Sequence, residues 1–368
     1  MLPIALLAGG LGMAACVDFA PAQDDPGKPK TPQVSARQKR TMVRLLAEFR
    51  RTRSKSRRDG IVKRLFALGT PGVQALRDEL DTQLADAMAR YENAFTKRAA
   101  ALAKSRRKDV KPAEIQGLRS KVLALRRRPD LTKEMIVQVA DPALKKLHGL
   151  LALDRRAVLK NAPRATIELR KRVQAVGRYH ELCTRQLARA NPAPRPIRRT
   201  RRKRRPKRPP GFEDYLRDRE RIAAQVAGDG NARMLEILAA NSKLAARLDP
   251  EEARNILYCN LTRNLLGLPV LAVDLKLSAA ARDHSSDMQR LKFFSHTSPI
   301  PEKRTYADRA VRFGTRASGE NIFMGRTDGY LAHDGWFHSP GHHRNMLAGH
   351  SRIGVGRIGL HFTQLFGR

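Results

Sequence analysis

The chain has 368 residues, and its 73 Lys and Arg residues against 35 Asp and Glu residues give a formal net charge of +38. This length is typical of two domains, and so large an excess of positive charge argues against an ordinary single enzyme domain. Hydrophobic residues make up 41% of the sequence, which excludes disorder throughout and allows a sizeable core. Residues 251–368 hold 16 basic and 10 acidic residues, so most of the positive charge lies in residues 1–250.

The first 22 residues are predicted to be a signal peptide. Residues 1–15 are small and apolar, and this run is too short to span a bilayer. The Ala-Pro-Ala segment at 20–22 has the pattern that precedes a signal-peptidase site, while Cys16 offers lipoprotein processing as an alternative. We therefore expect an exported protein, periplasmic, extracellular or at the cell surface, with no membrane span after cleavage. A buried or frayed N-terminal helix is the alternative interpretation.

A basic, all-helical region is predicted over residues 37–190, after a Pro-, Gly- and Lys-rich linker at 23–36. Apolar residues recur there at three- and four-residue steps, as in amphipathic helices. The Thr-Pro pair at 70–71 and the Asp-Pro pair at 141–142 each combine a capping residue with Pro at the first helical position, so each predicts the start of a helix. No repeat of fixed period is found, which favours a bundle or a long hairpin over a solenoid.

The densest charge lies at 195–208, where ten of fourteen residues are Lys or Arg and Pro residues interrupt any helix. We predict a disordered basic linker over 191–212 and a helical connector over 213–249. The linker is a predicted binding site for an anionic envelope polymer or membrane surface, with a solvated spacer as the alternative. No aromatic residue is interleaved for base stacking, which argues against nucleic acid. The predicted polyanion-binding residues are Arg198, Arg199, Arg201, Arg202, Lys203, Arg204, Arg205, Lys207 and Arg208.

Residues 250–368 are predicted to form a separate domain, and eight of the ten His residues lie in it. The Asp-Pro pair at 249–250 is expected to start one helix and Asp274 to lead into a second, and a further helix is expected near 329–337. Residues 353–358 and 361–366 alternate as two short strands around a glycine turn. The predicted fold class is α+β, with a C-terminal α/β/α sandwich preceded by the basic helical region.

The C-terminal domain resembles the CAP superfamily of cysteine-rich secretory, antigen 5 and pathogenesis-related proteins, the SCP-like domains, in their compact bacterial form. The resemblance covers about the last third of the chain. It rests on short motifs that follow one another in the family's order, which include Asn260-Leu261-Thr262-Arg263, Phe294-Ser295-His296, Gly319-Glu320-Asn321-Ile322, Ser339-Pro340-Gly341-His342, Asn345-Met346-Leu347 and Gly354-Val355-Gly356.

The resemblance implies a cleft in which His296, His342 and Glu320 converge, with Glu320 in a turn. Ser339 stands where many eukaryotic members have a second acid, so a triad of site residues is expected in place of a tetrad. A serine nucleophile is disfavoured there, because Ser before Pro-Gly is typical of a turn or cap. Arg309 matches a family arginine and is expected to pair with an acid.

Four further residues surround this predicted cleft. Trp336 is expected to wall the cleft or to fill the core, and Asn345 to hold the following loop through hydrogen bonds to the backbone. His338 and His343 flank the motif and are expected to be exposed beside the cleft.

Three functions remain open at this level. The leading hypothesis is a non-catalytic exported protein that binds an apolar or envelope-derived ligand in the cleft, with no required cofactor. Two imidazoles and a carboxylate are also a workable zinc set, so a metal-assisted hydrolase or peptidase using His296, Glu320 and His342 is the alternative. The third is a polyanion- or nucleic-acid-binding protein that acts through the basic region. A disulfide between Cys183 and Cys259 also stays open.

Overall fold

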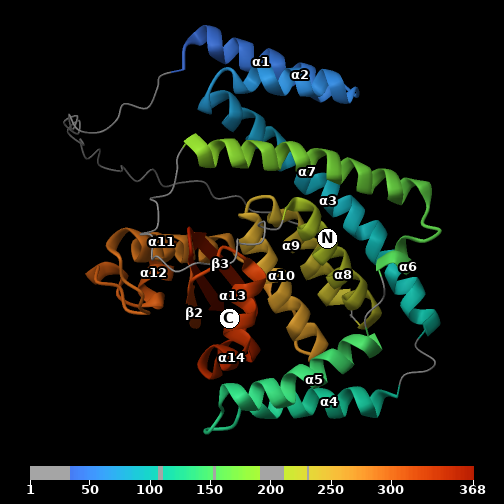
Figure 1. Cartoon of the computed structure of the whole chain (residues 1–368), viewed down its shortest axis with the longest axis vertical. Coiled ribbons are helices and arrows are strands. Elements are labelled where there is room, and N and C mark those ends of the chain that lie inside the picture. Colours follow the sequence, from blue (N-terminus) through green and yellow to red (C-terminus); the bar gives the residue numbers. More distant parts are fainter. Residues whose placement is uncertain (1–33, 107–110, 152–154, 191–210, 230–231) are drawn as a thin grey trace, which may run out of the picture.

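The computed structural model describes residues 34–106, 111–151, 155–190, 211–229 and 232–368 (Figure 1). The predicted signal peptide and nearly all of the predicted basic linker therefore lie outside the described residues. In the described part of the chain, no helix is both long enough and apolar enough to cross a membrane.

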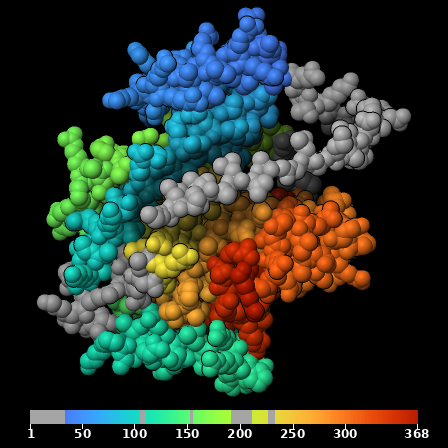
Figure 2. Space-filling model, turned by 180° about the vertical axis from the view of Figure 1, so that it is seen from behind, coloured from blue at the N-terminus to red at the C-terminus, as the bar shows by residue number. Residues whose placement is uncertain are grey.

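The N-terminal region is helical throughout, as predicted. Its helices are α1 (Ala36–Arg51), α2 (Lys55–Phe66), α3 (Thr70–Arg106), α4 (Pro112–Leu125), α5 (Lys133–Leu151), α6 (Arg155–Leu159), α7 (Arg164–Ala190), α8 (Phe212–Asp229) and α9 (Ala232–Ala245). Helices α7, α8 and α9 all pack along the 37-residue helix α3. The α1–α2 hairpin lies at one end of the molecule, away from the C-terminal domain (Figures 1 and 2).

One helix start predicted from the sequence is wrong. The Asp-Pro pair at 141–142 does not begin a helix, because Pro142 lies inside α5, which begins at Lys133. The Thr132 hydroxyl accepts from the backbone N–H of Met135 and supplies the cap. Burial of Ile136, Ala140 and Leu147 on one side of α5 keeps the helix continuous through the proline, although Pro lacks a backbone donor.

The C-terminal domain is a three-layer sandwich. Its elements are α10 (Pro250–Leu265), β1 (Ala272–Val273), α11 (Leu275–Leu291), the 3₁₀ turn η2 (Pro301–Lys303), α12 (Tyr306–Arg312), β2 (Gly319–Met324), α13 (Gly329–Phe337), α14 (Pro340–Leu347), β3 (Arg352–Ile358) and β4 (His361–Gly367). The sheet has the order β1-β3-β4-β2, and only the β1–β3 pair is parallel. Helix α11 packs on β3 and β4, while α10 contacts β3, and α13 and α14 contact β2. The fold class is α+β, as predicted.

The Gly-Val-Gly motif of β3 sets how closely α11 approaches the sheet. A Cβ atom at Gly354 would lie 2.3 Å from the backbone nitrogen of Ser278, and one at Gly356 would lie 2.0 Å from that of Arg282. Because side chains alternate along a strand, Val355 points to the other face and is fully buried there. The two glycines therefore let the helix backbone rest directly on the strand.

The helical region and the C-terminal domain share one hydrophobic core. Helix α8 lies between α3 and α10 and contacts both, and its Ile222 and Ala224 are buried. The Asn241 side chain of α9 donates to the Leu271 carbonyl (2.9 Å) and accepts from the Val273 N–H (2.7 Å). The segment that the sequence suggests is a connector therefore covers the edge of the sheet.

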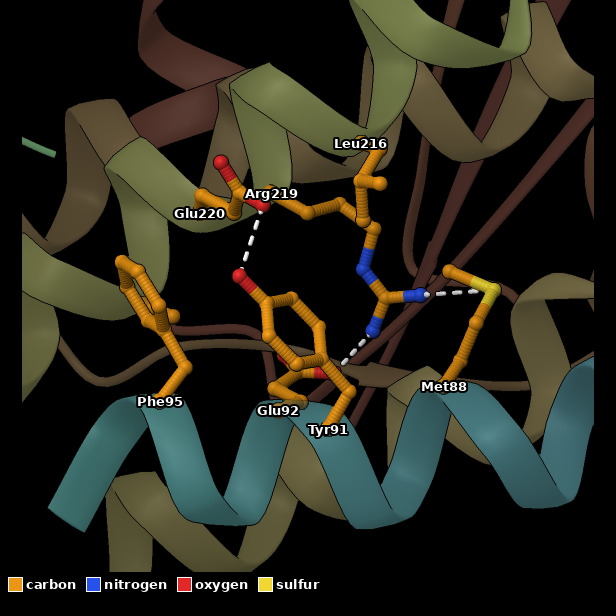
Figure 3. A pocket seen from close by; sticks show the side chains of 8 residues that line it. Met88, Tyr91, Glu92, Phe95, Leu216, Arg219 and Glu220 are labelled. Atoms are coloured by element: carbon orange, nitrogen blue, oxygen red, sulfur yellow. Dashed lines mark hydrogen bonds and ion pairs between the residues drawn. The ribbon is translucent and has the colours of Figure 1, made fainter. Parts of the chain in front are cut away.

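A buried polar network fixes α8 against its neighbours (Figure 3). The Tyr91 hydroxyl of α3 donates to Glu220 Oε1 at 2.8 Å, and Arg219 forms an ion pair with Glu92. Arg219 and Glu220 are 4% and 2% exposed. Breaking a buried charge pair by removal of one partner costs about 3–5 kcal/mol, so these contacts strongly disfavour other positions of α8 on α3.

Candidate functional site

His296 lies in the loop that leaves α11. The helix ends at Leu291, and Lys292 follows in the left-handed conformation with φ of 56°, so the chain turns sharply there. The side chain of His296 is 53% exposed, and its backbone carbonyl accepts from Arg309 Nη2 at 3.2 Å. The loop therefore presents an exposed imidazole from an anchored backbone.

Glu320 and Arg309 form a completely buried ion pair beneath this loop. Arg309 Nη2 donates to Glu320 Oε2 at 2.5 Å, and both side chains are 0% exposed. The other carboxylate oxygen, Oε1, lies 2.9 Å from His296 Nδ1. Arg309 also donates to the Lys303 carbonyl at 2.8 Å. The sequence suggested an acid as the partner of Arg309, and the structure identifies that acid as the site glutamate.

The predicted turn at Glu320 is instead a strand. Residues 319–324 form β2, in which Glu320 pairs with Leu365 of β4. Side chains alternate between the two faces of β2, and the Glu320 side chain lies on the face beneath the His296 loop. Its carboxylate is therefore buried, and hydrogen bonds and an ion pair are needed to stabilise its charge there.

His342 approaches His296 from α14. The centroids of the two rings are 6.2 Å apart, with 48° between the ring planes. His342 is half-buried, and burial followed by repulsion from His296 lowers its pKa. Asn345, one turn further along α14, donates to the Glu320 carbonyl and to Asn321 Oδ1, both at 3.0 Å. Asn345 thus ties α14 to β2, whereas the sequence predicted that it would hold the loop after His342.

The helical region holds α14 from the outside. Arg126 at the end of α4 donates to the Leu347 carbonyl at 2.6 Å, and Arg344 donates to the Arg128 carbonyl at 2.7 Å. His338 Nε2 lies 3.0 Å from Asp141 of α5. Burial opposes protonation of His338, but the hydrogen bonds to Asp141 and to the Asp334 carbonyl outweigh it and raise the pKa.

Four other predictions around the cleft can be compared with the structure. His343 was expected at the surface and is fully buried, with Nδ1 donating to the Phe337 carbonyl at 2.7 Å. His338 is 17% exposed and paired with Asp141, so it is not a free surface group. Trp336 is 1% exposed and donates to the Ile322 carbonyl at 2.9 Å, which places it in the core. Ser339 is the N-cap residue of α14, and its carbonyl accepts from the His343 N–H.

His284 is a site neighbour that sequence reasoning did not assign. It is fully buried on α11, and its Nε2 donates to the Ser295 carbonyl at 3.1 Å. Burial lowers its pKa, while the nearby Glu320 carboxylate opposes this effect. His284 is therefore a neutral imidazole that fixes the start of the His296 loop. His284 is four residues from both Ala280 and Met288, so the sequence pattern could have predicted that it lies on the buried face of α11.

The zinc hypothesis can be tested on the donor atoms themselves. Glu320 Oε1 contacts His296 and Oε2 contacts the positively charged Arg309, so a cation at Glu320 would meet an arginine in a site of low polarity. Across the described ranges, no group of three or more His, Cys, Asp or Glu side chains is arranged to hold a metal ion. This arrangement does not fit zinc, and we derive no metal-assisted step.

Other predicted features lie elsewhere in the chain. The predicted polyanion-binding residues at 198–208 are outside the described residues. Cys183 and Cys259 are both buried free thiols, so the disulfide that the sequence left open is not formed here.

Comparison with known proteins agrees with the domain that this fold and site define. Residues 256–360 match the model of the cysteine-rich secretory protein family, known as CAP. Residues 256–360 of this chain are therefore a CAP domain.

Similar proteins come from bacilli. The uncharacterized protein YkwD of Bacillus subtilis (strain 168) is 34% identical over 118 residues, which are 31% of this chain and 46% of that protein. The uncharacterized membrane protein YlbC of the same strain is 34% identical over 110 residues, which are 29% of this chain and 31% of that protein. The chain thus spans less than half the length of these relatives.

A solved structure is also similar. It is the 1.5 Å crystal structure of an extracellular protein containing an SCP domain from Bacillus anthracis str. Ames, with 33% identity and a TM-score of 0.32. The match covers 34% of this chain and 43% of that chain.

Proposed function

We propose that this chain is an exported, non-catalytic binding protein whose CAP domain holds a cell-envelope ligand at His296 and His342. The proposal rests on the contacts of the Glu320 carboxylate. Its buried carboxylate contacts His296 through one oxygen and Arg309 through the other. A carboxylate held in this way orients the His296 ring and is not placed to take a proton from a substrate, so the site favours binding over turnover.

The surface beside His296 supports a ligand with an apolar part. Phe294 is 46% exposed and Leu291 is 40% exposed, and both lie within five residues of His296. Two large exposed apolar side chains on the segment that leads to His296 suit an amphiphilic molecule, whose polar end would bind the imidazoles by hydrogen bonds while its apolar part covers Phe294.

Export and attachment to an anionic surface complete the proposal. Export is supported by the signal-like segment at 1–22, and attachment by the run of ten basic residues at 195–208. Both rest on the sequence pattern alone.

Mass spectrometry of molecules that co-purify with the full chain tests the cleft. We expect an envelope-derived amphiphile to accompany the wild-type protein and to be lost from His342→Ala. His361→Ala is the matched control, because His361 lies at the other end of the β2–β4 ladder from Glu320. If the protein instead cleaves a mixed peptide library and His342→Ala abolishes cleavage, the non-catalytic assignment is wrong.

A further inference from the structure

The α1–α2 hairpin carries a concentration of positive charge that is independent of the basic run at 195–208. Residues 34–66 contain 12 Lys and Arg residues but only two acids, Glu48 and Asp59. Both acids are already engaged, because Glu48 pairs with Arg64 at 2.7 Å and Asp59 accepts from the Tyr179 hydroxyl at 2.8 Å. The remaining basic groups of the hairpin are left largely uncompensated.

Four of these basic groups line one hollow. The concavity between α1 and α2 has a volume of about 690 Å³, and Arg44, Arg51, Arg53 and Arg57 lie around it. Ala47, Thr52, Ser54 and Glu48 complete its lining, and the Glu48 carboxylate is already paired with Arg64. All four arginines are exposed, and their guanidinium groups have no hydrogen-bond or ion-pair partner among the described residues. Four free guanidinium groups around one concavity repel each other unless an anion lies between them.

The backbone beneath the hollow is held in place. Arg58 donates to the Thr52 carbonyl at 2.7 Å, and its guanidinium lies 5.2 Å from the centroid of the Phe49 ring. Phe49 is 1% exposed and packs edge-on against Tyr179. Helix α2 starts at the hollow, capped by Ser54, so the positive end of its dipole adds to the arginine charge. The site is therefore built before a ligand arrives.

We propose that the α1–α2 hollow binds a linear phosphate polymer through its phosphates alone. Guanidinium groups pair with phosphate oxygens in a planar, bidentate manner, which suits an arginine-lined site. No aromatic side chain lines the hollow, so nothing is present on which bases would stack. Val43 is the one large apolar side chain that is strongly exposed among the described residues of the hairpin, so an interfacial membrane helix is disfavoured.

The test uses the full chain and a fourfold variant, R44Q/R51Q/R53Q/R57Q. The matched control is K121Q/R127Q/K133Q/K145Q, which removes the same charge from four exposed residues of the α4–α5 hairpin and its connecting turn. The probes are inorganic polyphosphate, oligothymidylate with the same number of phosphates, and vesicles of phosphatidylglycerol. Circular dichroism and thermal melting show whether each variant keeps the wild-type fold.

We expect polyphosphate to bind at least as tightly as oligothymidylate. The fourfold variant should lose about tenfold or more in affinity at low salt, and the slope of log K against log salt should fall by up to about 3. The control should behave as the wild type. The difference should persist when both proteins lack residues 195–208, which separates this site from the basic run.

Three outcomes would overturn the proposal. Unchanged affinity and slope in the folded fourfold variant would show that the hollow does not bind. Oligothymidylate binding more than tenfold tighter than polyphosphate would mean that bases are recognised and that the partner is nucleic acid. Binding to vesicles without binding to either polymer would identify a membrane surface instead.

Discussion

The α1–α2 hairpin and the CAP domain both rely on arginine, but they place it in opposite environments. In the hairpin, Arg44, Arg51, Arg53 and Arg57 are exposed around a hollow without a partner in the described chain. In the CAP domain, Arg309 is 0% exposed, and its two terminal nitrogens donate to Glu320 and to backbone carbonyls. Free guanidinium groups at a surface favour recognition of an outside anion, whereas a buried, paired one organises the fold.

The largest expected effect on stability comes from replacing the buried Arg309. Arg309→Met leaves the Glu320 carboxylate without its charged partner in a dry site, so the free energy of unfolding should fall by about 3–5 kcal/mol. Urea denaturation followed by circular dichroism measures this change. Arg312→Ala, an exposed position at the end of the same helix, is the control and should change stability by less than about 0.5 kcal/mol. Equal effects of the two substitutions would contradict the assigned role of Arg309.

Two glycine substitutions sharpen the contrast between the regions. Gly356→Ala should cost up to about 3 kcal/mol, because its Cβ would lie 2.0 Å from a backbone nitrogen of α11 that cannot move away cheaply. Gly60→Ala in α2 meets nothing within 4 Å, and it should stabilise the protein by about 0.5–1 kcal/mol through helix propensity. Thermal melting of the two variants side by side is the measurement, and shifts of the same sign would refute the assigned packing.

A further expected effect on stability depends on pH. Burial, followed by repulsion from His338, lowers the pKa of His333 to about 3, so the folded state stays neutral where the unfolded state, near pKa 6.5, takes up a proton. Stability is therefore lost as pH falls below 6.5, on the order of 2 kcal/mol from His333 at pH 5. Burial raises the pKa of Glu251 to about 7, and this acts in the opposite direction.

The contribution of His333 is isolated by comparing the wild type with His333→Gln between pH 7.5 and pH 5. Glutamine does not titrate and can keep the hydrogen bond that His333 makes with the Thr262 hydroxyl at 3.1 Å. We expect the variant to lose less stability over this range than the wild type. If the stabilities of the two proteins fell in parallel between pH 7.5 and pH 5, His333 would not be the cause of the pH dependence. The α1–α2 hairpin contains no His, so its polyanion affinity should not follow this profile.

Much of the CAP domain could be predicted from local sequence. The α13 helix and the strands β3 and β4 around Gly359 follow the predicted ranges closely, because alternation and a glycine turn with φ of 57° are local signals. The convergence of His296, Glu320 and His342 followed from the family resemblance, and the structure places the three together. The pairing of Arg309 with an acid was predicted, but its partner was not, because 11 residues and a change of element separate Arg309 from Glu320.

Other features depended on tertiary packing. Pro142 lies inside α5, His343 is buried, and Glu320 belongs to a strand, each against the local expectation. In each case, packing that local sequence patterns do not show decided the outcome. Burial of its apolar face kept α5 continuous, the Phe337 carbonyl six residues away accepts from buried His343, and pairing with β4 made residues 319–324 a strand.

The sequence by itself determined the class of the C-terminal domain, the helical nature of the rest and the uneven charge, since these follow from motif, periodicity and composition. Only the tertiary structure decided that α8 and α9 join the helical region and the CAP domain in one core, and that four arginines of the α1–α2 hairpin surround one hollow. The reason is physical: periodicity shows which face of a helix is apolar, but not which other face will cover it.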